Sequence, residues 1–215
     1  LAEISDGHLY KANDMVKADC GGCEGCSQCC HGMGNSIILD PYDVYRMTTG
    51  MGKSMQELLA ASVELNVVDG VILPNLKMQG TEEACAYLDE EGRCSIHPYR
   101  PGICRLFPLG RYYENGGFSY FLQTGECAKE NRSKIKVSKW IDTPDLTRNQ
   151  QFTLQWHDLL HAMEERLTGE DEGKQREENI LLLRLFYLLP YEGTIDFYTQ
   201  FTERMEHWNG QNGQI

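Results

Sequence analysis

Cysteine spacing constrains this chain more than any other feature. Five of its nine cysteines fall within eleven residues, in the string CGGCEGCSQCC that begins at Cys20. Cysteines two residues apart rarely bridge their neighbours, but a loop with this spacing can wrap several sulfurs around one centre. Thiolates packed this closely repel one another unless a cation lies between them. The string therefore favours a metal or cluster site.

Disulfides are a weaker interpretation of the same cysteines. An odd count of nine argues against a fully paired framework. A chain of 215 residues can also build a core without covalent links. Redox thiols and buried cysteines that act as small apolar residues stay as alternatives. This cysteine usage leads us to expect a cytoplasmic protein.

Charge and hydropathy exclude several classes of partner. The formal net charge is -12, which disfavours phosphate backbones and anionic membranes. No run of about 18 apolar residues occurs, so no membrane-spanning helix is expected. We expect neither a nucleic-acid nor a membrane partner, and the redox or protein partner stays unidentified. Hydrophobic residues make up 41% of the chain, which is enough for a core.

Local signals in the first half predict two short helices and a hairpin. Residues 1–19 are mixed and polar with weak helical character, and residues 20–36 form an irregular cysteine loop. Asp40, followed by proline, is a candidate N-cap. Ser54, with a glutamate three residues on, predicts a capping box. Residues 66–78 surround Asp-Gly and predict a hairpin.

The second half changes from loops to helices. The proline-rich segment 97–110 predicts loop with one helical turn, and the segment that follows predicts a hairpin around ENGG. Apolar residues at helical spacing then predict three helices, over residues 145–167, 174–189 and 194–208.

These elements predict an α+β fold. It consists of an irregular cysteine-rich metal-binding lobe with short hairpins, plus a C-terminal helical segment. We predict two domains, a metal-binding domain over residues 1–142 and a helical segment over residues 143–215 packed on it.

The cysteine strings carry a family resemblance. They are CEGCSQCC over residues 23–30 and CSIHPYRPGICRLFP over residues 94–108, with a cysteine before and after the second string. The chain resembles the CxxCxxCC family of zinc- or iron-chelating domains over roughly residues 20–130. Cys20 is outside the family pattern. The resemblance implies eight metal ligands: Cys23, Cys26, Cys29, Cys30, Cys85, Cys94, Cys104 and Cys127.

The resemblance also implies candidate functions. Family members are commonly described as iron–sulfur oxidoreductases, and the family includes flagellin lysine N-methylase, which is considerably longer than this chain. We expect an iron–sulfur protein in electron transfer or a cluster-dependent enzyme activity. The alternatives are a zinc-stabilised protein-binding module and a methyltransferase-like modifying enzyme. Enzymatic activity stays open, and no catalytic residue is identified.

Ligand chemistry favours an iron–sulfur cluster over zinc. Thiolate-only ligation suits both. Zinc fingers usually use two separated Cys-x2-Cys pairs, whereas here one region holds five cysteines. The repeated Cys-x2-Cys spacing resembles bacterial ferredoxin ligation. We therefore expect a [4Fe–4S] cluster, with eight ligands sufficient for two, and keep zinc as the alternative.

Basic residues near the second string are candidates to contact the cofactor. Arg100 and Arg105 bracket Cys104 and could offset the negative charge of a thiolate-bound centre. The alternative is that both arginines pair with surface carboxylates. His31 and His97 could each replace a ligand, although hydrogen bonding to nearby sulfur or backbone is the more common role.

One histidine pair resembles a zinc-protease motif. His157 and His161 stand four residues apart in HDLLH, which resembles HExxH. On a helix both point away from the apolar stripe that runs from Phe152 to Leu167. A solvated polar face is the better interpretation.

Overall fold

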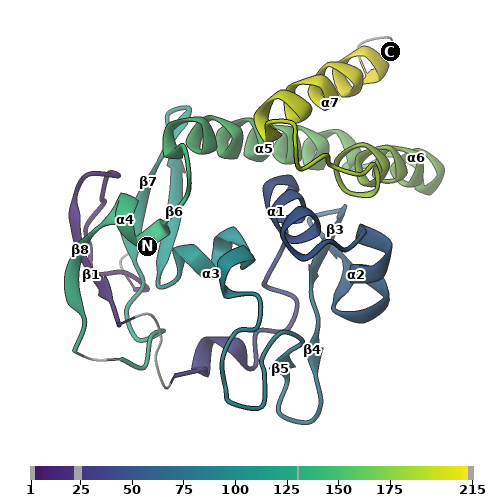
Figure 1. Cartoon of the computed structure of the whole chain (residues 1–215). Coiled ribbons are helices and arrows are strands. Elements are labelled where there is room, and N and C mark those ends of the chain that lie inside the picture. The colour runs from purple at the N-terminus through teal and green to yellow at the C-terminus, as the bar shows by residue number, and fades with distance from the viewer. Residues whose placement is uncertain (1–2, 22–25, 130, 213–215) are drawn as a thin grey trace. The chain divides into compact units, whose positions relative to one another are not determined.

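The structure combines helices with pairs of antiparallel strands. The computed structural model describes residues 3–21, 26–129 and 131–212 (Figure 1). Its strands pair two by two in separate antiparallel sheets, and its long helices all lie after residue 145. The predicted α+β class with a C-terminal helical segment is confirmed. No helix in the described ranges is long and apolar enough to cross a membrane.

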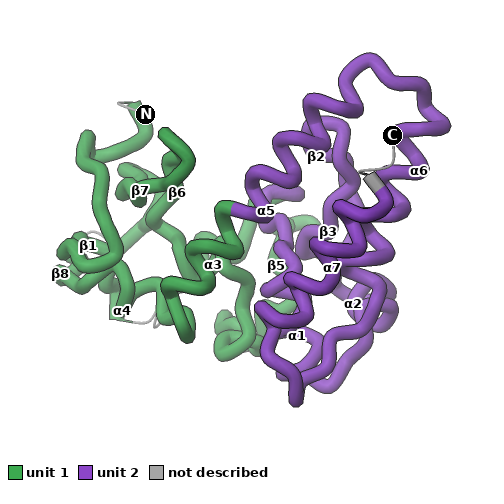
Figure 2. Tube along the Cα trace, turned by 90° about the horizontal axis from the view of Figure 1, so that it is seen from above, with its two compact units in different colours: residues 1–34, 78–154 green, residues 35–77, 155–215 purple. Residues whose placement is uncertain are grey.

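The chain forms two compact units, and each is built from two stretches of sequence. The first unit comprises residues 1–34 and 78–154, and the second comprises residues 35–77 and 155–215 (Figure 2). The chain therefore passes from one unit to the other three times. The predicted domain boundary at residue 142 stays a prediction.

The first unit consists of three two-stranded antiparallel sheets linked by loops and short helices. Two of the sheets are hairpins, β4 with β5 and β6 with β7, and the third pairs β1 with the distant β8. The elements in chain order are β1 (Met15–Asp19), η1 (Gln28–Cys30), β4 (Met78–Gln79), β5 (Ala84–Cys85), η2 (His97–Tyr99), α3 (Gly102–Leu106), β6 (Leu109–Glu114), β7 (Gly117–Leu122), β8 (Ser133–Lys136) and α4 (Val137–Ile141).

The segment before the cysteine loop is a strand, so the weak helical character predicted for residues 1–19 is wrong. In β1, Val16 and Ala18 are buried and their neighbours are not, which is the two-residue period of a strand. Its partner β8 lies more than one hundred residues away in sequence. The core that both strands join contains Val16, Ala18, Leu106, Leu109, Tyr120, Leu122, Val137 and Ile141.

The β6–β7 hairpin forms where the ENGG signal predicted it. Its turn places Asn115 and Gly116 at φ +51° and +70°, a left-handed geometry that favours these residue types. The strands pair in register from Leu109 opposite Leu122 to Glu114 opposite Gly117. β6 begins at Leu109, shortly after α3, so the hairpin directly follows the helix that carries Cys104.

The second unit is mostly helical and contains one hairpin. Both predicted caps are confirmed: the Asp40 and Ser54 side chains accept from the backbone N–H groups of Asp43 and Glu57. The elements are α1 (Pro41–Met51), α2 (Met55–Ala61), β2 (Val63–Val68), β3 (Val71–Leu76), the C-terminal part of α5 (Leu146–Leu167), α6 (Glu172–Leu183), η3 (Arg184–Leu188) and α7 (Phe197–Asn212).

A buried asparagine joins the β2–β3 hairpin to α6. The turn residues Asp69 and Gly70 both have positive φ, as the Asp-Gly signal predicted. Asn179 accepts from the Ile72 backbone N–H at 2.6 Å and donates to the Gly70 carbonyl at 3.2 Å. The hairpin turn is thus held by one side chain of α6.

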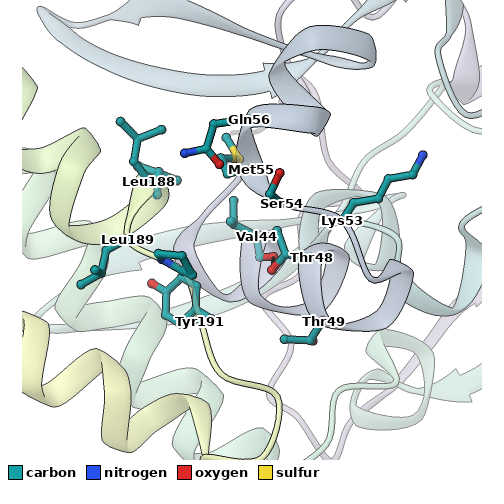
Figure 3. Close-up of a pocket in the computed structure, with 12 residues that line it drawn as sticks. Val44, Thr48, Thr49, Lys53, Ser54, Met55, Gln56, Leu188, Leu189 and Tyr191 are labelled. Carbon is teal, nitrogen blue, oxygen red and sulfur yellow. Dashed lines mark hydrogen bonds between the residues drawn. The ribbon is translucent and has the colours of Figure 1, made fainter.

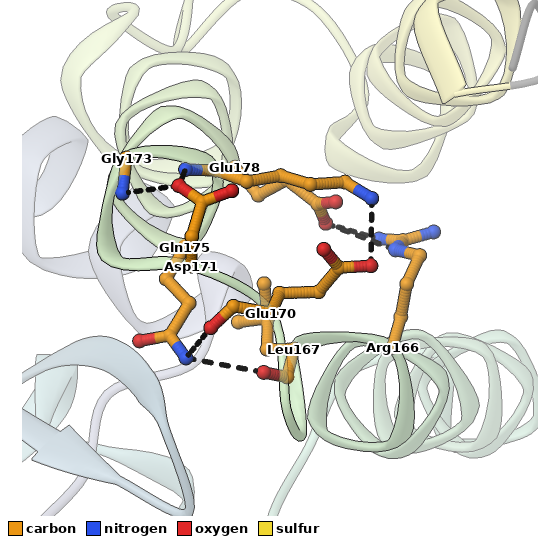
Figure 4. Close-up of polar contacts among 8 residues, drawn as sticks. Arg166, Leu167, Glu170, Asp171, Gly173, Gln175 and Glu178 are labelled. Atoms are coloured by element: carbon orange, nitrogen blue, oxygen red, sulfur yellow. Dashed lines mark hydrogen bonds and ion pairs between the residues drawn. The ribbon is translucent and has the colours of Figure 1, made fainter.

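Polar contacts connect the end of α5 to the start of α6 (Figure 4). The Arg166 guanidinium donates to the buried Glu178 carboxylate at 2.7 and 2.9 Å. Asp171 caps α6 by accepting from the backbone N–H groups of Gly173 and Lys174. Gln175 donates back to the Leu167 carbonyl at 3.2 Å. These contacts satisfy polar groups that the helix ends leave exposed.

The helix predicted over residues 174–189 changes geometry before it ends. It is α-helical to Leu183, and η3 then forms a π-helical turn. Arg204 of α7 binds the carbonyls that follow, with donors 2.8 Å from Leu185 O, 3.0 Å from Leu189 O and 2.9 Å from Pro190 O. Its guanidinium carbon also lies 3.5 Å from the centre of the Tyr191 ring.

Substituting the buried Arg204 with alanine is expected to lower the free energy of unfolding by about 3 kcal/mol, because it removes three charge-assisted hydrogen bonds to backbone carbonyls and the contact with the Tyr191 ring. Urea unfolding followed by circular dichroism measures this change. Arg184→Ala, at an exposed arginine of η3, is the matched control and should change stability by less than about 0.5 kcal/mol. Equal effects of the two substitutions would contradict the anchoring role of Arg204.

Candidate metal centre

Every described cysteine lies in the first unit. Eight thiols, those of Cys20, Cys26, Cys29, Cys30, Cys85, Cys94, Cys104 and Cys127, are half-buried, and none of these eight forms a disulfide. Cys23, which the sequence also predicts as a ligand, is outside the described residues. Half-buried thiols from several loops of one unit are consistent with a shared binding site.

A short backbone bridge connects the end of the first cysteine string to the strand that carries Cys85. Cys29 and Cys30 lie on η1, and the next residue, His31, pairs with Ala84 of β5. The Gly32 N–H also donates to the Glu83 carbonyl at 3.0 Å. This pairing sets Cys30 beside Cys85, although 55 residues separate them in the sequence.

Two of the cysteines accept hydrogen bonds from the backbone two residues ahead. The Tyr87 N–H donates to the Cys85 sulfur, and the Ile96 N–H donates to the Cys94 sulfur. A bridge between Leu88 and Cys94 holds the two segments together around the turn at residues 89–92. Amide donors stabilise a negatively charged sulfur, so both loops are prepared to present thiolates.

The adjacent thiols of Cys29 and Cys30 share a proton. A hydrogen bond from Cys30 lowers the pKa of Cys29 to about 7, and the same bond raises the pKa of Cys30. The charges of Cys29, Cys85 and Cys104 further raise the pKa of Cys30, which places these sulfurs within electrostatic reach of one another. Cys29 is thus the thiol of the pair that ionises first.

Burial opposes ionisation of Cys85 and of Cys94, the first cysteine of the second string. It raises the pKa of both Cys85 and Cys94, and the amide hydrogen bonds only partly offset this effect. Cys85 also interacts with the charge of Cys29, and Cys94 with that of Cys85. Several half-buried sulfurs that resist ionisation within electrostatic reach of one another are best stabilised as thiolates by a cation.

The two candidate arginines have different surroundings. The charge of Arg100 favours the ionised form of both Cys29 and Cys94, although burial raises the pKa of Cys94 on balance, so the Arg100 guanidinium lies within electrostatic reach of two sulfurs. Arg105 is buried, and its Nη1 donates to Thr143 Oγ1 at 2.9 Å. The role of both arginines at a bound cofactor stays a prediction.

Four cysteines line one pocket of the first unit. Cys20, Cys26, Cys29 and Cys127 share this pocket with apolar side chains. Its free space is about 20 Å³, which is room for about one water molecule. Cys29 therefore belongs both to the pocket and to the group of coupled sulfurs that includes Cys30 and Cys85. The pocket walls also include Gln28, Phe107, Pro108, Glu126, Ala128, Lys129 and Trp140.

The cysteine sulfurs lie in one unit but do not form a complete set of metal ligands around one point. Within the described ranges, no three side chains of His, Cys, Asp or Glu lie close enough together to hold a metal ion. Metal binding is coupled to folding of the segments that supply the ligands, because a preformed site rarely exists in the unfolded chain. The donor set itself, soft thiols with amide donors, fits zinc or an iron–sulfur centre.

Histidines near the cysteines make other contacts. His31 Nδ1 lies 3.0 Å from the Ser27 carbonyl, which agrees with backbone hydrogen bonding. His97 contacts the Arg100 guanidinium, and burial followed by that charge lowers its pKa. His157 and His161 have side chains 37% and 59% exposed on α5, so the solvated-face interpretation agrees with the structure.

Some residues of the site carry no signal in the sequence. The amide donors of Tyr87 and Ile96 are backbone groups, so no residue type identifies them. Lys129 and Trp140 follow the last cysteine without any motif, although both line the pocket. Only the position of Lys129, two residues after Cys127, could have indicated a cation near the sulfurs.

A second pocket lies within the second unit and has a different character. It lies among α1, the start of α2 and the segment after η3, with Val44, Thr48, Ser54, Leu189 and Tyr191 on its walls (Figure 3). Its volume is about 110 Å³, below the about 300 Å³ of typical small-molecule sites. It contains no cysteine and contributes nothing to the metal centre.

Together, the gathered thiols and their amide donors define a cysteine-cluster, metal-binding protein that chelates zinc or iron. Comparison with known families gives the same class. The CxxCxxCC family, described as "putative zinc- or iron-chelating domain", matches residues 22–131, just over half of the chain. The chain belongs to this family. No match was found among curated proteins or among solved structures.

Proposed function

We propose that this protein binds an iron–sulfur cluster and acts in electron transfer or in a cluster-dependent redox reaction. The observation that supports this most is the pair of backbone N–H donors aimed at the Cys85 and Cys94 sulfurs. Hydrogen bonds to ligating sulfurs are one of the main ways in which proteins tune iron–sulfur centres.

The proposed cluster ligands are Cys30, Cys85, Cys94 and Cys104. The first two are adjacent through the bridge between His31 and Ala84. Cys94 interacts with the charge of Cys85, and Cys104 with that of Cys30. The four sulfurs come from η1, β5, the segment before η2, and α3. Four thiolates are the number of ligands that a [4Fe–4S] cluster requires. The remaining family cysteines, Cys23, Cys26, Cys29 and Cys127, stay proposed metal ligands.

Charge balance supports the same group. Four thiolates around a cluster carry net negative charge, which needs nearby cations or N–H donors. The charge of Arg100 favours the Cys94 thiolate, and the Ile96 amide donates to the Cys94 sulfur. We propose that Arg100 contacts the cluster environment directly, whereas the buried Arg105 positions α3 through Thr143.

Exposure of the loops fits a role in redox exchange. When bound, an iron–sulfur cluster supplies one-electron chemistry. Cys104 is half-buried, and the neighbouring Ile103 is 38% exposed on α3. An apolar residue at the surface beside a ligand is suited to contact with a redox partner protein. The thiols must also stay reduced before the metal binds, so we propose that the protein works in the cytoplasm.

Anaerobic purification tests the proposed function. We expect a coloured protein that contains iron and acid-labile sulfide in equal amounts and gives an electron paramagnetic resonance signal after reduction with dithionite. Cys94→Ser should lose both components together. A colourless protein that carries stoichiometric zinc, and gains no stable cluster on reconstitution, would contradict the proposal and favour the zinc-stabilised module.

A further inference from the structure

We propose that one face of the β1–β8 sheet is a docking surface for an acidic protein. The two strands lie side by side, and α4 follows β8 directly (Figure 1). Docking does not depend on a metal, whereas the identification of this protein as the redox partner rests on the proposed function. The face, called the lysine ribbon below, consists of Met15, Lys17, Lys134 and Lys136, and Lys139 of α4 extends it.

Strand geometry turns these lysines toward solvent. Val16 of β1 pairs with Ile135 of β8, and both pack in the apolar core of the first unit. Because successive side chains of a strand point to opposite faces, the residues on either side of Val16 and Ile135 point away from the core. All of these flanking residues are exposed: Met15, Lys17, Lys134 and Lys136.

No carboxylate offsets the charge of the lysine ribbon. Within the described ranges, Lys17, Lys134, Lys136 and Lys139 form no ion pair and no side-chain hydrogen bond. Like charges on neighbouring strands of one sheet face repel one another and lower stability. A partner surface that carries carboxylates would remove this repulsion, so the charge of the ribbon specifies an acidic occupant.

The positive charge is confined to one part of a negative molecule. Residues 129–139 contain five lysines and arginines and one glutamate, although the whole chain has a formal net charge of -12. The rest of the chain therefore repels an extended polyanion such as duplex DNA or an anionic membrane. A compact acidic protein contacts one face only, and the local field orients it toward that face.

An exposed methionine gives the lysine ribbon an apolar contact. Met15 is 49% exposed and lies opposite Lys136 across the sheet. Methionine is enriched at protein–protein interfaces, and its flexible thioether adapts to the surface of a partner. The phosphates of a nucleic acid gain nothing from such a contact. Met15 therefore favours a protein as the occupant, in an interface as small as those of transient redox encounters.

The lysine ribbon adjoins the cysteine-bearing loops. Cys20 follows the last residue of β1 directly, and it lines one pocket with Cys127 and Trp140. The Trp140 indole of α4 also donates to the Leu106 carbonyl of α3, the helix that carries Cys104, at 3.2 Å. A protein bound on the ribbon therefore lies next to elements that carry proposed metal ligands, which is the position that a redox partner needs.

Binding of poly-L-glutamate to the full-length protein tests the docking surface. Wild type should bind this acidic polypeptide, and binding should weaken as salt is added. Lys134→Glu combined with Lys136→Glu should weaken binding at least about tenfold. Lys53→Glu combined with Arg176→Glu, at exposed residues of the second unit, changes the net charge equally and should weaken binding less than about threefold.

Several results would overturn the proposal. They are no binding of poly-L-glutamate by wild type, equal losses in the two double variants, and tighter binding of duplex DNA or phosphatidylserine vesicles than of the acidic polypeptide. Iron and sulfide content should be the same in all variants. A protein that contains no iron but binds poly-L-glutamate through the lysine ribbon would contradict the proposed function and leave the docking surface intact.

Cross-linking of the wild-type protein keeps the test decisive if the ribbon variant does not fold. Carbodiimide joins lysine amines to carboxylates that lie in direct contact, and mass spectrometry identifies the lysines that react. With poly-L-glutamate, the cross-links should concentrate at Lys17, Lys134, Lys136 and Lys139. Cross-links spread evenly over the exposed lysines of both units would contradict a defined docking surface.

Discussion

Without metal, the backbone amides of Tyr87 and Ile96 are expected to exchange with solvent about a thousandfold faster, equivalent to about 4 kcal/mol of lost local stability. Both amides donate to cysteine sulfurs, so their protection depends on loops that the metal holds. Between residues 78 and 104, Tyr87 and Ile96 supply most of the buried apolar side chains. These loops therefore have little apolar core to stabilise them when the ligand is removed.

Hydrogen exchange with and without an anaerobic chelator measures this effect. The Tyr120 N–H is the internal control, because it bonds to the Tyr10 carbonyl at 2.9 Å and Tyr120 belongs to the apolar core of the first unit. Its exchange should change by less than about tenfold. Equal acceleration at Tyr120 and Tyr87 would show global unfolding of the first unit. No acceleration at Tyr87 would show that the loops hold their structure without metal.

Replacing Cys94 by serine is expected to weaken metal binding at least about a hundredfold, or about 3 kcal/mol. A serine oxygen is a poor ligand for the soft metals that thiolates select. The Ile96 N–H and Arg100 would then face a neutral hydroxyl in place of a thiolate. Competition against a chelator of known affinity, with iron and sulfide analysis of the same samples, measures the change.

The matched control for this substitution is His161→Ala. His161 lies on the exposed face of α5, where it contacts Glu164, Glu165 and the His157 ring. If HDLLH were a zinc motif, His161→Ala would also lower metal content. The expected result is no change in metal content for the histidine variant and large loss for the cysteine variant. Similar losses in both would contradict the cysteine-only ligand set.

Features with local physical causes could be predicted from the sequence. The capping boxes at Asp40 and Ser54 and the turns at Asp69 and Asn115 depend on residues within four positions of one another. Sequence therefore predicted two helix starts and two hairpins correctly. The cysteine spacing also predicted the metal-binding class, because it reflects the chemistry of the ligands and does not depend on the path of the chain.

Features that depend on distant pairing could not be predicted. β1 reads as a polar segment, and only its pairing with β8 reveals the alternation of Val16 and Ala18. The grouping of sulfurs has the same origin, since the bridge from His31 to Ala84 decides that Cys30 meets Cys85. The π-helical turn of η3 coincides with carbonyl contacts made by Arg204, about twenty residues further on.

The most direct test of the account is X-ray absorption at the iron and zinc edges of wild-type protein prepared without oxygen. The account predicts a shell of sulfur neighbours at about 2.3 Å around the bound metal, with an added iron–iron distance if a cluster is present. A shell of nitrogen and oxygen neighbours, or cysteines recovered as disulfides with no metal bound, would contradict it.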